Sequence, residues 1–252
     1  MIRILLSFLA AIVLALGLDA VPAQAQQGGP PLSVFVAAQG LDSNPCTFAQ
    51  PCRTFQHAHD TVAFGGLINV LDPGNYSPLK ISKSVSIQGH GVVGISVSTG
   101  ETAISVNSSD PIITITVTLD GLVIDGVGLA KTGIELIGAG RANLFINNCV
   151  VRNFLQSGIA LKPGGGMSNV AVSNTVVTAN RDHGIFLQPT VAADAGAIFG
   201  SFNRVEANGN GITGIAIFGN LLLDPLDAQL LRELAENRDW EAQSLPNIPA
   251  ST

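Results

Sequence analysis

The sequence predicts an all-β fold in which the chain winds into a parallel β-helix, a solenoid of stacked coils with a short helix at each end. Composition, an internal repeat and the alternation of apolar and polar residues predict this fold. Of the 252 residues, 46% are hydrophobic, only 12% are charged and 28 are glycine. Such a chain is too apolar to be disordered and too poor in charge to form a coiled coil. Many Val, Ile and Thr residues with many glycines are typical of an all-β protein with tight turns.

The repeat is the main evidence for stacked coils. Four segments share the pattern Gly-Ile-x-Leu or Gly-Ile-x-Ile: Gly133–Leu136, Gly158–Leu161, Gly184–Leu187 and Gly214–Ile217. They begin 25, 26 and 30 residues apart, a length with room for about three short strands and the bends between them. One such unit cannot bury its apolar side chains alone, whereas stacked units can. We therefore expect equivalent strands of successive coils to pair.

A second strand-like run precedes each of the last three segments and ends in asparagine. These asparagines are Asn153, Asn180 and Asn208, and Asp125 holds the equivalent place one coil earlier. Stacked Asn side chains at a bend can hydrogen-bond to each other, and Asn tolerates left-handed backbone. We expect these four residues to form one column along the stack.

The segments before the repeat predict further coils and a cap. Alternation of apolar and polar residues predicts strands at 85–89, 95–97, 103–106 and 112–119. Residues 53–64 are expected to form a short helix, with Thr54 as N-cap and Gly65-Gly66 at its end. A helix in this place would cover the open end of the solenoid.

The C-terminal segment predicts a second helix. Asp224 can serve as N-cap with Pro225 at the first helical position. A helical stripe follows, made of Leu226, Leu230, Leu231 and Leu234. We expect a helix over residues 224–242 that closes the last coil, followed by a loose tail.

The first 25 residues have the organisation of a secretory signal peptide. Arg3 precedes an apolar stretch over residues 4–18, and Ala23-Gln24-Ala25 offers a cleavage pattern. A membrane anchor is the alternative, but 15 apolar residues fall short of the ~20 that span a bilayer. We expect a secreted or periplasmic protein without membrane attachment after cleavage. The predicted organisation is a signal peptide (1–25), a β-helix domain (26–223) and a C-terminal helix and tail (224–252).

The predicted export guides the interpretation of the three cysteines, because disulfides form in oxidising compartments. Cys46 and Cys52 are close in sequence, and in an exported protein such a pair predicts a local disulfide. A zinc site would need further ligands spaced nearby. Cys149 lies in an apolar stretch and is expected to be a buried free thiol, with pairing to another chain as the alternative.

Four segments near the start of the mature chain resemble a known family: Phe35-Val36, Gly40–Thr47, Pro51–Phe55 and Asp72–Tyr76. They are similar to the opening segment of secreted right-handed β-helix proteins of the pectin-lyase-like superfamily, although Cys46 stands where that family usually has Gly. The likeness covers residues 34–76, and the repeats extend it to about residue 219. It implies a right-handed coil. The superfamily includes polysaccharide lyases, hydrolases, epimerases, adhesins and members without assigned activity.

The resemblance leaves two hypotheses for function. The first is a protein that binds polysaccharide and, if it is an enzyme, cleaves it as a lyase or glycoside hydrolase does. The second is a non-catalytic structural or surface-interaction module. A fold alone does not decide between them.

The repeat offers no stacked catalytic groups. A polysaccharide lyase needs a base and a cation, often calcium held by acidic residues on neighbouring coils. The middle outward position of the Gly-Ile strands holds Glu135, Ala160, Phe186 and Ala216. The next outward position holds Lys162, Gln188 and Phe218. No calcium cage emerges, and no cofactor is expected. Asp182-His183-Gly184 resembles a fragment of a hydrolase motif, but the paired Asp and the Arg-x-Lys of that motif are missing.

The densest polar cluster is Asn180-Arg181-Asp182-His183. Arg181, Asp182 and His183 are the candidate catalytic or binding residues, because an Arg, a carboxylate and an imidazole at one turn could bind an acidic sugar or transfer a proton. The alternative is an ordinary solvated turn. A net charge of −6 without a run of Lys or Arg argues against a nucleic-acid partner. The oligomeric state stays open.

Overall fold

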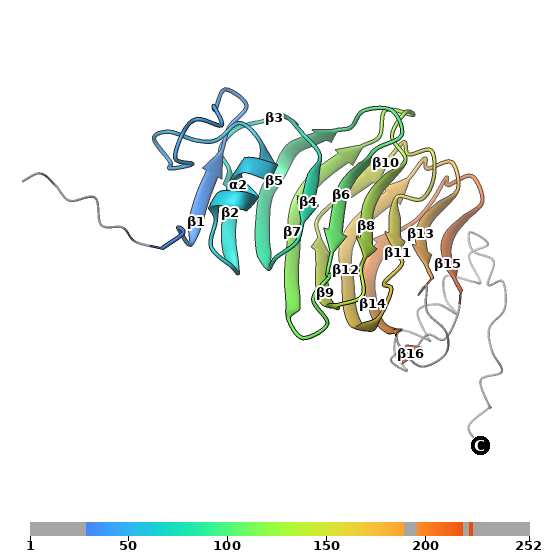
Figure 1. The fold of residues 1–252 in the computed structure, drawn as a ribbon. Coiled ribbons are helices and arrows are strands. Elements are labelled where there is room, and N and C mark those ends of the chain that lie inside the picture. Colours follow the sequence, from blue (N-terminus) through green and yellow to red (C-terminus); the bar gives the residue numbers. More distant parts are fainter. Residues whose placement is uncertain (1–28, 189–195, 219–221, 224–252) are drawn as a thin grey trace, which may run out of the picture.

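The computed structural model describes residues 29–188, 196–218 and 222–223. The predicted signal peptide and the helix expected over 224–242 lie outside the described residues. Within them the chain forms a parallel β-helix of about five turns, in which strands of successive coils pair in parallel (Figure 1). The predicted fold class is confirmed. The right-handed sense of the winding stays a prediction, favoured because parallel crossovers are almost always right-handed.

One side of the solenoid is a six-stranded sheet, which we call sheet B. Its strands stack in the order in which they occur along the chain. They are β4 (Leu79–Ile81), β6 (Thr102–Asn107), β8 (Thr132–Ile137), β11 (Ile159–Leu161), β13 (His183–Leu187) and β15 (Thr213–Ile217). The four Gly-Ile segments of the repeat supply the last four of these strands.

The repeat sets the register of sheet B, as predicted. Ile159 pairs with Ile134 on one side and with Ile185 on the other, and Ile185 pairs with Ile215. Each of these isoleucines is at most 3% exposed. Equivalent apolar positions therefore meet inside the solenoid and form a continuous core column.

The other two sides belong to the ten-stranded sheet A. Its strands are β1 (Ser33–Val36), β2 (Gly66–Val70), β3 (Gly74–Tyr76), β5 (Val85–Ser96), β7 (Thr114–Asp125), β9 (Arg141–Asn147), β10 (Val150–Arg152), β12 (Gly166–Thr178), β14 (Gly196–Glu206) and β16 (Leu222–Leu223). Between its two sides the backbone turns through residues with positive φ, among them Gly121, Asn148, Asn174 and Arg204. We call the part of each coil before this bend the first leg and the part after it the second leg.

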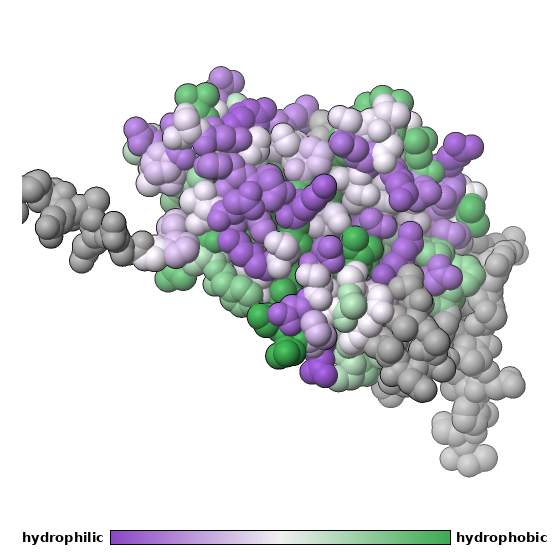
Figure 2. Space-filling model, in the orientation of Figure 1, coloured by the Kyte–Doolittle hydropathy of each residue, from purple (hydrophilic) through white to green (hydrophobic). Residues whose placement is uncertain are grey.

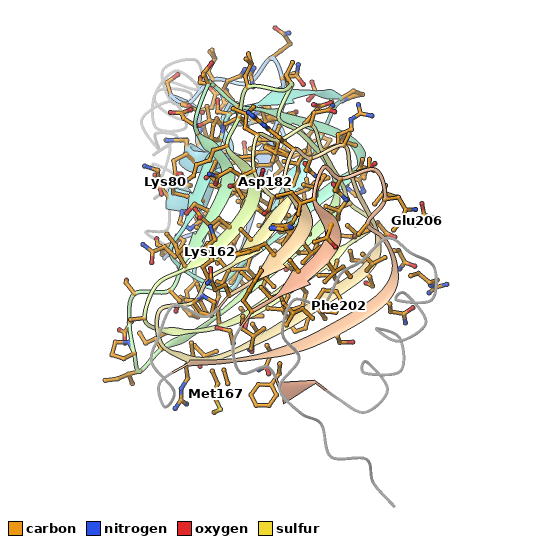
Figure 3. The ribbon with its side chains drawn as sticks, turned by 90° about the vertical axis from the view of Figure 1, so that its right-hand side faces the viewer. Lys80, Lys162, Met167, Asp182, Phe202 and Glu206 are labelled. Carbon is orange, nitrogen blue, oxygen red and sulfur yellow. A yellow bond between two sulfur atoms is a disulfide. The ribbon has the colours of Figure 1, made fainter. Side chains whose placement is uncertain are left out.

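Figure 3 looks along the stack and separates the sides of the coil. Lys162 and Asp182 project from one side, Glu206 from the opposite side, and Met167 lies at the lower edge. Phe202 points to the inside from the first leg and is only 2% exposed. The interior is thus filled by apolar side chains from all three sides.

The register contradicts most of the expected asparagine column, which comprised Asp125, Asn153, Asn180 and Asn208. One expected contact between neighbours does form, because the Asn153 Nδ2 atom donates to the Asp125 Oδ1 atom at 2.9 Å. Strand pairing places Asp125 opposite Arg152, the residue before Asn153, and Arg152 opposite Thr178, two residues before Asn180. The number of residues between the paired strand positions and the following Asp or Asn differs from coil to coil. Aligning the coils by these residues therefore does not give the observed strand pairing. Asn180 stacks on Asn210 instead, with its Nδ2 atom 2.9 Å from the Asn210 Oδ1 atom.

The N-terminal helix covers the end of the stack, as expected, but it is shorter than predicted. Helix α2 spans Phe55–Thr61 and not residues 53–64. Thr54 is its N-cap, and its side chain accepts a hydrogen bond from the His57 N–H group. The helix ends before the glycines because Val62 is already extended, with ψ 148°, and is fully buried.

The strand expected over residues 112–119 begins at Thr114 instead. The Asp110 carboxylate accepts hydrogen bonds from the backbone N–H groups of Ile112 and Ile113, so these two residues form a turn. Ile112 is 87% exposed and Ile113 48% exposed. Figure 2 shows hydrophobic surface at the lower edge of the molecule, where this loop lies.

The cysteine predictions are confirmed in two respects. Cys46 and Cys52 form a disulfide, with Cα atoms 4.7 Å apart. Cys149 is a buried free thiol, and burial raises its pKa to about 11. A disulfide is compatible with an oxidising compartment. None of the described residues form a helix long and apolar enough to cross a membrane.

Candidate functional site in a corner groove

In the polar cluster found in the sequence, residues 180–182 lie in the turn between β12 and β13, and His183 is the first residue of β13. The Arg181 N–H group donates to the Phe154 carbonyl of the preceding coil at 2.8 Å. In the following coil, the Gly211 N–H group donates to the Asn180 carbonyl, also at 2.8 Å. The turn is held between two neighbouring coils, which fixes the position of its side chains.

An open groove of about 620 Å³ runs along this corner of the stack, where the second leg passes into sheet B. Turns of four successive coils contribute to it. The lining residues are Asp125, Val127, Gly128, Asn153, Phe154, Leu155, Ala179, Asn180, Arg181, Gly209 and Gly211. Because it crosses several coils, this corner groove suits an elongated ligand that lies along the axis of the solenoid.

Asp125 lines the groove but serves the structure. Its Oδ1 atom accepts hydrogen bonds from the Val127 N–H group and the Asn153 side chain, both at 2.9 Å. Its Oδ2 atom accepts from the Arg152 Nε atom at 2.8 Å. Burial alone would raise the pKa of this carboxyl group, but the hydrogen bonds from Asn153, Val127 and Arg152 outweigh it and lower the pKa. Asp125 is therefore a carboxylate with its charge already paired.

Asn180 forms the rigid floor of the groove. It is 2% exposed, and its Oδ1 atom accepts a hydrogen bond from the Phe154 N–H group at 3.1 Å. Its Nδ2 atom donates to Asn210, whose own Nδ2 atom donates to the Val177 carbonyl at 3.0 Å. The sequence analysis identified Asn180 but missed Asn210. A search for Asn at a spacing of 30 residues, the last interval of the repeat, would have found it.

Arg181 supplies the cation of the groove. Its side chain is exposed, and the described part of the structure records no ion pair or hydrogen bond for its guanidinium group. The backbone beside it is closely approached by the next coil, since a Cβ atom on Gly211 would lie 2.0 Å from the Arg181 carbonyl oxygen. Only glycine fits at residue 211, which keeps this wall of the groove low and the guanidinium accessible.

His183 points away from the groove, onto the outer face of sheet B. Its ring stacks on Phe186 with centroids 5.2 Å apart, and Phe186 contacts Phe218 at 5.3 Å. Burial lowers the pKa of His183, although the charge of Asp182 opposes the shift. The His183 Nδ1 atom is buried, and no hydrogen-bond partner for it lies among the described residues. The structure thus separates Arg181 from His183, two residues that the sequence analysis had grouped.

One pair of opposite charges lies on sheet B beside these rings. The Lys162 Nζ atom lies 3.8 Å from a Glu135 carboxylate oxygen and 5.5 Å from the centre of the Phe186 ring. Ala160, between them in the outward column, is only 1% exposed. Figure 3 shows Lys162 and Asp182 on this same side of the coil. The Phe186 ring is contacted by His183, Phe218 and Lys162, so it does not offer a flat platform to a sugar.

One group near the N-terminus has the residue types of a metal site. Cys46, Cys52 and His57 have ligand atoms within 4.8 Å of one another, the one such grouping of three that the described ranges contain. The two sulfur atoms are joined in the disulfide, which removes the thiolates that a metal would need. Asp42 accepts hydrogen bonds from Arg53 and Thr54 at 2.8–2.9 Å, so it anchors the start of α2.

Comparisons of this chain with protein-family models, with curated proteins and with solved structures find no match. The interpretation of the corner groove rests on its own residues and on their geometry.

Proposed function

We propose that this protein is exported and binds an acidic polysaccharide in the corner groove without cleaving it. The observation that carries the proposal is the guanidinium of Arg181, which has no partner among the described residues, in an elongated groove that crosses successive coils. The resemblance of residues 34–76 to pectin-lyase-like proteins supports the same class of ligand, and the Cys46–Cys52 disulfide supports export.

The lining of the groove suits a uronic-acid sugar. A guanidinium binds a carboxylate through two parallel hydrogen bonds, which gives both strength and orientation. Val127 and Leu155 supply apolar surface for the C–H face of a sugar ring. The Asn153 side chain uses its Nδ2 atom on Asp125, which leaves its Oδ1 atom to accept a hydrogen bond from a sugar hydroxyl. Neighbouring coils are about 4.8 Å apart, so a chain of sugars along the axis would meet similar turns repeatedly.

Binding fits the titratable groups better than cleavage. A carboxylic acid that protonates a leaving group needs a raised pKa. The carboxyl group that lines the groove is that of Asp125, and hydrogen bonds that outweigh the opposing effect of burial lower its pKa. His183 lies outside the groove, so it is not placed to act as a base on a ligand held by Arg181.

The proposal is tested by measuring the affinity of purified protein for polygalacturonate by gel-retardation electrophoresis. Arg181→Ala is expected to weaken retention about tenfold or more, since a charge-assisted hydrogen-bonded contact contributes ~1.5–3 kcal/mol. Added salt should weaken the parent's binding as well. Lys80→Ala is the matched control, because it removes one exposed positive charge from sheet B, outside the groove lining.

Three results would contradict the proposal. Equal retention of Arg181→Ala and the parent would remove the groove as the site. Release of unsaturated or reducing ends from the polysaccharide would show cleavage. No retention on any acidic polysaccharide would favour the alternative of a structural or surface-interaction module.

A further inference from the structure

The turn that follows β14 contains two asparagine–glycine pairs in succession, Asn208-Gly209 and Asn210-Gly211. The last residue of β14, Glu206, is labelled in Figure 3. An asparagine that precedes glycine can lose its side-chain amide in water without an enzyme, because glycine has no Cβ atom to shield its backbone nitrogen. The two pairs have the same residue types, so the surroundings of each pair decide whether it reacts.

The first pair is open to solvent. Asn208 and Gly209 are both exposed, and the described part of the structure records no hydrogen bond for the Asn208 side chain or for the Gly209 N–H group. The Thr178 hydroxyl group donates to the Asn208 carbonyl at 2.6 Å, which holds the backbone but leaves the side chain free. A Cβ atom on Gly209 would meet the Thr178 hydroxyl oxygen at 3.5 Å, an ordinary contact. The Asn208 amide and the Gly209 nitrogen can therefore approach each other and water.

The second pair is held in the stack. The Asn210 Nδ2 atom donates to the Val177 carbonyl at 3.0 Å, and its Oδ1 atom accepts from the Asn180 backbone and side chain at 3.1 and 2.9 Å. The nitrogen that would attack is also engaged, because the Gly211 N–H group donates to the Asn180 carbonyl at 2.8 Å. Reaction at Asn210 requires these bonds between coils to break first.

We propose that Asn208 is a site of spontaneous deamidation and that the stack protects Asn210 from the same reaction. The Gly209 nitrogen gives its proton to hydroxide and forms a bond to the Asn208 Cγ atom. The bond between Cγ and Nδ2 breaks, and the amide nitrogen takes a proton from water and leaves as ammonia. Water then opens the cyclic imide, which gives aspartate by attack at Cγ or isoaspartate by attack at the backbone carbonyl. Water and its hydroxide ion are the co-reactants, and nothing is oxidised or reduced.

Deamidation places a new negative charge at the rim of the corner groove. Gly209 lines the groove, and Asn208 directly precedes it. A carboxylate in place of the amide would repel an acidic chain that approaches Arg181. This consequence rests on the proposed function, whereas the deamidation itself requires no ligand.

The test incubates the folded full chain in mildly alkaline buffer and follows each asparagine by mass spectrometry, with fragmentation that separates residue 208 from residue 210. Asn208 is expected to convert about tenfold or more faster than Asn210, because reaction at Asn210 requires local opening of the stack. The same chain in guanidinium chloride is the matched control, since both pairs should convert at similar rates once the stack is unfolded. Equal rates in the folded chain would overturn the proposal, as would conversion of Asn208 in guanidinium chloride alone.

Two substitutions separate the modification from the groove. Asn208→Gln should abolish the conversion at residue 208 and slow the acidic shift in isoelectric focusing, because the longer side chain forms the imide ring far less readily. Asn208→Asp carries the product's charge from the start and should bind polygalacturonate about threefold more weakly than Asn208→Gln, the scale of one repulsive charge in water. If the parent is not retained on polygalacturonate, the proposed function fails while mass spectrometry still decides the deamidation. An acidic shift in Asn208→Gln at the parent's rate would show that the modification site lies elsewhere.

Discussion

At the scale of single residues, the structure distinguishes polar side chains that hold coils together from those that are free to bind. Asn180 and Asp125 both line the corner groove, yet their side chains are engaged in hydrogen bonds to neighbouring coils and, for Asp125, also to the Val127 N–H group of its own turn. Arg181 stands beside them without a recorded side-chain partner in the described ranges. The sequence shows the same polar character for all three, because composition does not reveal which lone pairs and N–H groups are already used.

Asn180→Ala is expected to lower the free energy of unfolding by about 2 kcal/mol. The substitution leaves the buried Phe154 N–H group without its acceptor and removes one of the two hydrogen bonds to the Asn210 Oδ1 atom, the other coming from the backbone N–H group of residue 180. A buried unsatisfied group costs ~1–3 kcal/mol. Urea denaturation measures the change. Asn208→Ala is the control, since Asn208 is exposed, and it should change stability by less than about 0.5 kcal/mol. Equal stability of the two variants would show that the Asn180–Asn210 stack contributes nothing.

At the scale of elements, helix α2 shows how a short segment becomes stable through its contacts. Seven residues are too few for an isolated helix in water. Asp42 anchors its start through Arg53 and Thr54, and the buried side chains of Phe55 and His59 dock it on the first coil. The N-cap was predictable from Thr54. The helix end was not, because it depends on the burial of Val62 against the stack.

The buried histidines predict how stability depends on pH. Burial lowers the pKa of His59, with Asp60 opposing and Lys83 adding to the shift, and burial lowers the pKa of His183. The unfolded chain then binds protons more readily than the folded one, so stability is complete above pH ~6.5 and is lost as the pH falls below it. The carboxyl groups with lowered pKa values reduce stability only when they are protonated, below pH ~4. The effects of the histidines and of the carboxyl groups on stability therefore occur in different pH ranges.

Urea denaturation at pH 7.5 and pH 5.5 tests this expectation. The parent should unfold at lower urea concentration at pH 5.5. His59→Gln and His183→Gln should each show a smaller difference between the two pH values, because each removes one titrating group. His57→Gln is the control, since His57 lies on the same helix and is only half-buried. If both test variants keep the parent's difference in urea unfolding between the two pH values, His59 and His183 are not the cause of the pH dependence.

At the scale of the whole molecule, each coil contacts mainly its neighbours, so stability accumulates along the stack rather than in one centre. The first coil has only one neighbouring coil. The Cys46–Cys52 disulfide and α2 both lie at that end, where they replace the missing contacts. Backbone bonds from Phe35 to Cys46 and from Cys52 to Phe35, each 2.9 Å, join the disulfide loop to β1.

Removal of the disulfide by Cys46→Ala with Cys52→Ala is expected to loosen the N-terminal end alone. The closed loop is short, so the loss is about 2 kcal/mol. Hydrogen exchange should accelerate in β1, β2 and α2, while β8, β11 and β13 keep the parent's protection, because a solenoid opens from its ends. Cys149→Ala, a buried substitution in a central coil, is the comparison. If hydrogen exchange accelerated equally in all strands, the disulfide would not act on the N-terminal end alone.

The sequence by itself determined the repeat, the pairing of the Gly-Ile strands, the disulfide and the candidate turn at residues 180–183. These follow from spacing, because a strand that repeats every coil must meet its equivalent. Only the tertiary structure decided the asparagine register and the separation of Arg181 from His183. Both depend on the number of residues at each bend and on the close approach of Gly211 to Arg181. A shift of one residue turns a side chain to another face, and contacts between coils set that shift.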